Sequence, residues 1–209
     1  MSFNADAHGG GRFKNSPSVD DAMGAIIVTG IPGVGKTTVM ETAAKARNLQ
    51  VAVYGTVMFE AAQTMGLVKH RDELRRLPAA DQKAVQRAAA VHIASMGDVI
   101  VDTHCTVKTP SGYLPGLPAW VLDALQPSTI VLVEATPQEI AMRRAKDATR
   151  KRDDDSVEAI AEHQEYNRRF AAAYATLTGA TVHTVHNHDG QVERAMKEIL
   201  AVVPQKAVR

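Results

Sequence analysis

The segment from residue 30 to residue 38 constrains the fold more than any other, and it reads Gly-Ile-Pro-Gly-Val-Gly-Lys-Thr-Thr. It matches the phosphate-binding pattern G-x-x-x-x-G-K-[ST], whose fixed positions are Gly30, Gly35, Lys36 and Thr37. Its glycines let successive N–H groups point into one concavity, where the following helix directs its positive N-terminus. An apolar run precedes the loop and a helical pattern follows it. The sequence therefore predicts a strand–loop–helix unit that binds a nucleoside triphosphate.

Each part of this loop has an expected role toward the phosphates. The Lys36 ammonium can reach the β- and γ-phosphates, and the Thr37 hydroxyl can bind Mg²⁺ directly. The residues expected to surround the phosphates are Gly30, Ile31, Pro32, Gly33, Val34, Gly35, Lys36, Thr37 and Thr38.

Short apolar segments alternate with helical patterns along the chain, which is typical of a parallel sheet covered on both faces. The expected strands are residues 25–29, 51–54, 99–102, 130–134 and 181–185. The expected helices are about 36–47, 57–65, 81–95, 119–125, 137–147, 156–177 and 191–202. A chain of 209 residues has room for one such domain. We therefore expect an α/β fold, a three-layer sandwich of the P-loop NTPase type with a five-stranded parallel sheet flanked by helices.

Composition excludes several other classes. A net charge of +1 gives no general electrostatic reason to expect nucleic acid or a membrane surface as a partner, and no apolar run is long enough to span a membrane. The single cysteine, Cys105, rules out an internal disulfide and fits a reducing, cytoplasmic compartment. Residues 1–22 are rich in small and polar residues and are expected to be a disordered tail rather than a targeting segment.

Two clusters of charge follow the second and fourth expected strands, at residues 71–76 and 143–155. A solvated helix face is the usual explanation for such runs. Both clusters, however, follow the carboxyl ends of strands, where open α/β sheets bind their ligands. Several arginines in one cleft would suit a reaction that gathers many phosphate oxygens.

At this point the chain resembles a known family, the archaeal-type adenylate kinases, which are trimeric P-loop phosphotransferases. The matching segments are 28–38, 54–58, 71–73, 102–104, 109–118 and 177–180. The sequence Gly-Tyr-Leu-Pro-Gly-Leu-Pro within the fifth segment is far more specific than the phosphate loop. The similarity extends from about residue 25 to residue 202, which is nearly everything except the N-terminal tail.

The resemblance implies the reaction ATP + AMP ⇌ 2 ADP with Mg²⁺, in a homotrimer. It also implies that residues 23–209 form the kinase domain, with an AMP-binding segment at about 55–95 and a short mobile lid at about 148–156. Such a lid would close over ATP only when both substrates are bound, which protects ATP from hydrolysis by water.

The site residues that follow from this resemblance fall into three groups. The transferring phosphoryl group would be stabilised by Lys36, Arg144, Arg150, Arg152 and Arg168. Of these, Arg144, Arg150 and Arg152 would belong to the lid. Thr37, and through water Asp102 at the end of an apolar strand, would hold Mg²⁺. The AMP site would include Gly55, Thr56, Met58, Arg71 and Arg75, with His104 and Tyr113 at the border of the cleft.

Two alternatives stay open on the residues alone. The acceptor could be another nucleoside monophosphate, or a small hydroxyl metabolite, because the loop reads only the phosphates of the donor. The chain could instead be an assembly factor or a nucleotide switch that uses ATP binding to control a partner. No Asn-Lys-x-Asp run for reading guanine occurs in the sequence.

Overall fold

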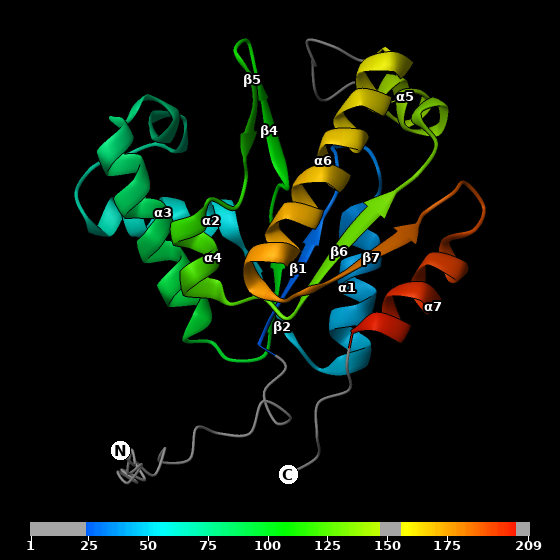
Figure 1. Ribbon diagram of the computed structural model, residues 1–209, viewed down its shortest axis with the longest axis horizontal. Helices are drawn as coiled ribbons and strands as arrows, with labels where there is room; N and C mark the ends of the chain where they lie inside the picture. Colours follow the sequence, from blue (N-terminus) through cyan, green and yellow to red (C-terminus); the bar gives the residue numbers. More distant parts are fainter. Residues whose placement is uncertain (1–23, 147–155, 204–209) are drawn as a thin grey trace, which may run out of the picture.

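A computed structural model describes residues 24–146 and 156–203 (Figure 1). The expected tail, residues 1–22, lies outside the described residues. So do residues 148–155 of the expected lid. Within the described ranges, no helix combines the length and the apolar character that crossing a bilayer requires.

Five parallel strands form the central sheet, as the alternation of elements predicted. Their order in the sheet is β2–β3–β1–β6–β7. The strands are β1 (Ala25–Thr29), β2 (Gln50–Val53), β3 (Val99–Asp102), β6 (Thr129–Glu134) and β7 (Thr181–His186). In the centre, Ile27 of β1 lies opposite Val101 of β3 and Ile130 of β6. All residues of β1 and β6 are buried, because helices cover these strands on both faces.

Helices cover the two faces of the sheet, and alternate side chains of each strand point to opposite faces. The helices are α1 (Lys36–Arg47), α2 (Tyr54–Thr64), α3 (Ala79–Ala94), α4 (Ala119–Leu125), α5 (Pro137–Lys146), α6 (Val157–Thr178) and α7 (Val192–Val202). Ile27 belongs to the core formed with α3, α4 and α6, whereas its neighbours Ile26 and Val28 belong to the core formed with α1, α5 and α7. The three-layer sandwich is therefore confirmed (Figure 1).

A smaller unit stands to one side of the sheet, where Figure 1 shows α2 and α3. It has its own small core around Ala62, Val68 and Val85. The charged run after α2 forms a 3₁₀ helix, η1 (Arg71–Arg76), with no buried residue. The carboxylate of Glu73 holds the start of η1 by accepting hydrogen bonds from the backbone N–H groups of Lys69 and His70, at 2.6 and 3.1 Å.

Two elements differ from the sequence prediction. Tyr54 begins α2 instead of ending β2, because its buried ring packs in the core and its hydroxyl donates to the carbonyl oxygen of Gln86 at 2.7 Å. The proline-rich segment after β3 forms an antiparallel hairpin, β4 (Thr106–Thr109) and β5 (Gly112–Pro115), which projects from the sheet (Figure 1). Its exposed cross-strand pair, Val107 and Leu114, lacks the burial that marks the central strands β1 and β6.

The hairpin is anchored at its base, where the backbone at Gly116 packs directly against the backbone at His104 and Cys105. The N–H of Gly116 donates to the carbonyl oxygen of Cys105 at 2.8 Å, and that oxygen also accepts from the hydroxyl of Tyr174 at 2.8 Å. The buried thiol of Cys105 lies in the same region, and burial raises its pKa to about 12, so it is an inert packing group.

We expect Gly116→Ala to lower the free energy of unfolding by about 2–4 kcal/mol. The added Cβ would lie 1.9 Å from the carbonyl oxygen of His104 and 2.9 Å from that of Cys105, and neither backbone atom can swing aside. Urea unfolding followed by circular dichroism measures the loss. Gly97→Ala is the matched control, because Gly97 has a φ of +76° but no described atom near its Cβ position, and about 1 kcal/mol is expected there. An equal loss of unfolding free energy in the two variants would contradict the close backbone contact at Gly116.

Candidate active site

The phosphate loop joins the end of β1 to the start of α1, as the motif predicted. Gly35 caps α1 with a φ of +82°, which a residue with a side chain adopts only at a cost. A Cβ at Gly30 would lie 2.6 Å from the carbonyl oxygen of Val133 in β6. The backbone conformation at Gly35 and the close packing at Gly30 therefore favour glycine, in addition to the need for N–H groups that face an anion.

Hydrogen bonds from outside hold the carbonyl side of this loop. The carbonyl oxygen of Val34 accepts from Arg143 Nη1 at 3.1 Å and from Asn187 Nδ2 at 2.8 Å. The carbonyl oxygen of Pro32 accepts from Arg144 Nε at 2.8 Å. In a trans peptide the N–H points opposite to the C=O, so the N–H groups of the next residues, Gly33 and Gly35, are turned to the other side. That orientation suits an anion held by the loop.

Arg144 differs from its predicted place in the lid. It lies in the last turn of α5, is 8% exposed, and packs over Gly33, whose Cβ position would be 2.9 Å from Arg144 Cγ. Ile140 and Arg144 are four residues apart, so they share the buried face of the helix. The contacts of Arg143 and Asn187 with the loop were not predicted from the sequence. Arg143 is adjacent to the predicted Arg144, so the sequence left open which arginine of the pair contacts the loop.

Lys36 and Asp102 meet in an ion pair where α1 and β3 approach each other. The Lys36 ammonium also donates to the carbonyl oxygen of Thr103 at 3.3 Å. Burial lowers the pKa of Lys36 to about 8, whereas the Asp102 carboxylate favours the charged ammonium, so the group is cationic at neutral pH. Thr37 is exposed in the first turn of α1, and its hydroxyl and the Asp102 carboxylate are hard oxygen donors that suit Mg²⁺.

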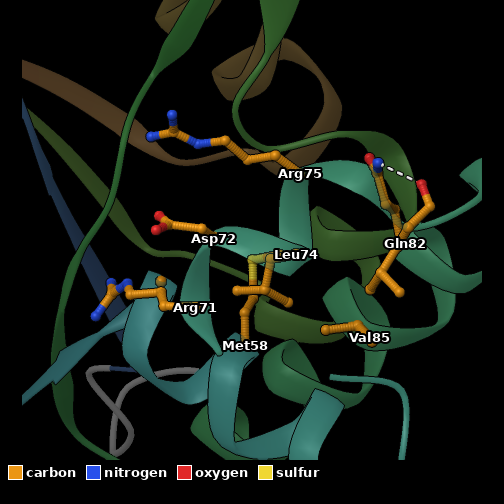
Figure 2. A pocket seen from close by; sticks show the side chains of 9 residues that line it. Met58, Arg71, Asp72, Leu74, Arg75, Gln82 and Val85 are labelled. Atoms are coloured by element: carbon orange, nitrogen blue, oxygen red, sulfur yellow. Dashed lines mark hydrogen bonds between the residues drawn. The ribbon is translucent and has the colours of Figure 1, made fainter. Parts of the chain in front are cut away.

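One cleft of about 390 Å³ brings together predicted residues from four separate segments. Those that line it are Lys36, Gly55, Met58, Arg71, Asp102 and His104. A second hollow of about 320 Å³ shares Gly55, Met58 and Arg71 with the cleft and adds Arg75 (Figure 2). The two hollows therefore adjoin, with Arg71 in the wall of both. Their size is in the range of sites for small molecules.

Arg71 lies directly over Gly55, where a Cβ would be 3.0 Å from its Nη2, and its Nη1 is 3.5 Å from the hydroxyl of Thr56. Arg75 lines the hollow of Figure 2, whereas Arg76 lines a different one beside Lys69 and Glu73. Within residues 24–146 and 156–203, no ion pair engages Arg71 or Arg75. Both guanidinium groups are thus positioned to meet an anionic ligand.

His104 and Tyr113 have different positions. His104 lines the cleft beside Lys36, and desolvation together with the Lys36 charge lowers its pKa, which leaves a neutral imidazole. Tyr113 lies on the other face of the hairpin from Leu114 and stacks on Tyr166 of α6, with ring centroids 4.0 Å apart. The strand alternation that directs Leu114 into the cleft directs Tyr113 to the other face of the hairpin, so Tyr113 does not line this cleft.

Arg168 forms a bidentate ion pair instead of lining the cleft with Lys36. Its Nε and Nη2 donate to the two carboxylate oxygens of Glu134 at 2.9 and 2.7 Å, and this pairing raises its pKa. A role on the bridging phosphates would require that pair to open. The remaining predicted arginines, Arg150 and Arg152, lie outside the described residues.

Comparisons with known proteins agree with this geometry. A family model described as an AAA domain matches residues 29–161. The adenylate kinase of Methanopyrus kandleri is 55% identical over 188 residues, which cover 87% of this chain and 98% of that protein. The adenylate kinase of Thermoplasma acidophilum is 49% identical over 177 residues, which cover 85% of this chain and 97% of that protein.

A solved structure shares the fold at much lower identity. Shikimate kinase from Bacteroides thetaiotaomicron superposes with a TM-score of 0.55 and 16% identity, covering 87% of this chain and 98% of that chain. The identities of 49% and 55% to the two archaeal enzymes extend over almost their full length. The chain belongs to the adenylate kinase family that these archaeal enzymes represent.

Proposed function

We propose that this chain transfers the γ-phosphoryl group of ATP to AMP with the cleft between the phosphate loop and η1 as its active site. The observation that carries the proposal is the presence of Lys36, on the donor side, and Arg71, on the acceptor side, in the walls of one cleft. An oxygen of the AMP phosphate attacks the γ-phosphorus, the bond from that phosphorus to the β,γ-bridging oxygen breaks, and two ADP molecules result.

The donor side stabilises charge with groups that are already in place. The loop N–H groups and the N-terminus of α1 would hold the β-phosphate, and Lys36 would exchange its contact with Asp102 for the transferring phosphoryl oxygens. Mg²⁺ would be held by the Thr37 hydroxyl and, through water, by Asp102. When bound, the ion would neutralise charge on the β- and γ-phosphates.

The acceptor side would be the segment of about residues 55–95, which comprises α2, η1 and α3. Arg71 and Arg75 would bind the AMP phosphate, because neither is engaged in an ion pair with a described residue and both line adjoining hollows. Gly55, Thr56 and Met58 would form the floor beside them. His104, neutral and next to Lys36, would contact substrate without adding charge.

We also propose that residues from about 148 to 156 form a lid that closes over ATP and directs Arg150 and Arg152 at its phosphates. Arg144 would brace the loop beneath that lid rather than move with it, because its Nε is bonded to the Pro32 carbonyl oxygen. We further propose that the protein is a homotrimer and is located in the cytoplasm. Light scattering that returned the mass of one or two protomers would rule out the trimer.

The direct test is product formation from ATP and Mg²⁺ with each nucleoside monophosphate in turn. We expect two ADP molecules for each AMP consumed, and no ADP without an acceptor. Chromatographic separation of the nucleotides measures both. Transfer to none of the monophosphates, with ATP still bound, would refute the proposed reaction.

We expect Lys36→Ala to lower kcat by about 10²-fold or more, because it removes a cation that acts on the transferring group. Lys45→Ala is the matched control, since Lys45 is exposed near the far end of the same helix. Steady-state kinetics at saturating ATP and AMP measure the difference. A similar kcat for the two variants would remove Lys36 from the mechanism.

We expect Arg71→Ala to raise the KM for AMP by at least about tenfold, because a charged hydrogen bond to phosphate is lost, while the KM for ATP stays near that of the unaltered chain. Arg76→Ala provides the control from the same 3₁₀ helix, because Arg76 lines a different hollow. If the KM for ATP rose and that for AMP did not, the acceptor site would lie elsewhere.

A further inference from the structure

The end of β7 places two histidine rings beside one hollow, and the proposed phosphoryl transfer uses neither of them. His186 is the last residue of this edge strand (Figure 1), and His188 follows two positions later. Their ring centroids are 5.9 Å apart, and both residues line a hollow of about 370 Å³. His183, three residues before His186 on the same strand, points to the opposite face of the sheet. Imidazole is the commonest metal-binding side chain, so the pair His186 and His188 is a candidate metal site.

Carboxylates lie on the Nδ1 side of both rings. His188 Nδ1 is 2.9 Å from Glu139 Oε2 of α5, and His186 Nδ1 is 3.8 Å from Glu198 Oε2 of α7. A carboxylate can only accept, so the neutral His188 ring carries its proton on Nδ1 and keeps a lone pair on Nε2. A carboxylate behind the far nitrogen is the usual companion of a metal-binding imidazole, because it fixes the tautomer and the direction of the ring.

Gln164 of α6 lines the same hollow and has an unused acceptor. Its side chain is buried, with 4% of the residue exposed, and its Nε2 donates to the carbonyl oxygen of Ala135 at 3.1 Å. A carbonyl oxygen can only accept, so the amide nitrogen must face Ala135 and the amide oxygen is turned away from it. Among residues 24–146 and 156–203, nothing forms a hydrogen bond with Gln164 Oε1. A buried acceptor of this kind is costly unless a ligand supplies the missing contact.

The charges around the hollow favour a cation. Arg168 lines the hollow, but its charge is balanced by the bidentate pair with Glu134, and Arg194 balances Glu198 in the same way. Within the described ranges, the ion pair of Glu139 is with His188. As long as that ring is neutral, the Glu139 carboxylate leaves one uncompensated negative charge beside the two imidazoles. A cation bound through the rings would offset this charge.

Two imidazole nitrogens and one amide oxygen form the donor set. In the described part of the chain, no three His, Cys, Asp or Glu side chains gather as a metal site, so the third ligand must be of another kind. Imidazole selects Zn²⁺, Ni²⁺ or Cu²⁺ over Mg²⁺. We propose that His186 Nε2, His188 Nε2 and Gln164 Oε1 bind one such ion, for which Zn²⁺ is the probe, with water as a fourth ligand. This site is separate from the Mg²⁺ site proposed at Thr37 and Asp102.

The spacing of the rings fits one shared ion. Two imidazoles bound to a tetrahedral ion at about 2.1 Å have ring centroids about 5–6 Å apart, and the observed separation is 5.9 Å. The rings are inclined by 15°, so one of them must turn before both lone pairs meet the ion. His186 is that ring, because its side chain is 47% exposed and its contact with Glu198 is the longer one.

A bound ion would fix the segment that braces the phosphate loop. Asn187 lies between the two histidines, and its side-chain Nδ2 donates to the carbonyl oxygen of Val34 at 2.8 Å. Its backbone N–H donates to the carbonyl oxygen of Glu134 at 2.8 Å. An ion shared with Gln164 would join both neighbours of Asn187 to α6. The site would therefore stabilise the donor side of the cleft without contacting a nucleotide, and the inference does not depend on the proposed function.

The first test is the binding of Zn²⁺ to the unaltered chain, stripped of metal by a chelator and kept without nucleotide. Titration calorimetry should find one saturable ion per chain, and an equal concentration of Mg²⁺ should not displace it. Zn²⁺ at 100 times its Kd should raise the melting temperature by about 5 °C or more. The absence of a saturable site would overturn the proposal.

Variants assign the ion to its ligands. Glu139→Gln should weaken the Kd for Zn²⁺ by about tenfold or more, because the carboxylate that orients His188 is lost. His186→Gln and His188→Gln should each weaken it by at least as much, since each removes a ligand. Gln164→Leu keeps the size of the side chain, removes the amide oxygen and should also weaken the Kd. His183→Gln is the matched control, because His183 lies on the same strand and faces the other way, and it should leave the Kd unchanged.

Co²⁺ in place of Zn²⁺ gives a readout that needs no variant. A four-coordinate Co²⁺ ion absorbs visible light far more strongly than the hydrated ion, so the unaltered chain should gain visible bands that saturate at one ion per chain. Thermal melts without metal identify any variant that fails to fold, and the Co²⁺ spectrum of the unaltered chain decides in that case. An unchanged Kd in both His186→Gln and His188→Gln, or an equal loss in His183→Gln, would place the ion elsewhere and overturn the proposal.

Discussion

The active site depends on the way in which the carbonyl side of the phosphate loop is held. A glycine-rich loop can turn its peptide groups in either direction, and only one direction presents N–H groups to an anion. Arg143, Arg144 and Asn187 fix that direction by donating to the carbonyl oxygens of Val34 and Pro32. These donors come from α5 and from the end of β7, so the third layer of the sandwich and the edge of the sheet set the geometry of a loop between β1 and α1.

Much of the fold could be predicted because its central strands are buried in the sheet and its helices are periodic. Ile26 to Val28 read as a continuous apolar run, because both faces of the central strand are covered. The hairpin of β4 and β5 could not be predicted in this way. Its residues Val107 and Leu114 are exposed, and its prolines favour a loop, so only the pairing of the two strands with each other defines it.

The candidate site was predictable where a local motif specifies it and unpredictable where distant segments meet. The glycines, Lys36 and Thr37 follow from one contiguous pattern, and Asp102 follows from its place at a strand end. For two adjacent arginines, by contrast, the sequence does not indicate which of the two side chains points into the site. Arg144 braces the loop and Arg168 binds Glu134, because the turn of each helix, and not the sequence cluster, decides where a side chain points.

The two sides of the cleft differ in how firmly they are held, and this difference bears on the choice between AMP and water. The donor loop is fixed by buried hydrogen bonds and packs on the main cores. The acceptor side includes η1, which has no buried residue and rests on a small core of its own. Elements with few buried contacts reorganise at low cost. On the proposed assignment, an acceptor phosphate that engages Arg71 and Arg75 would order this side of the cleft, whereas a water molecule, which carries no charge and no base, would not.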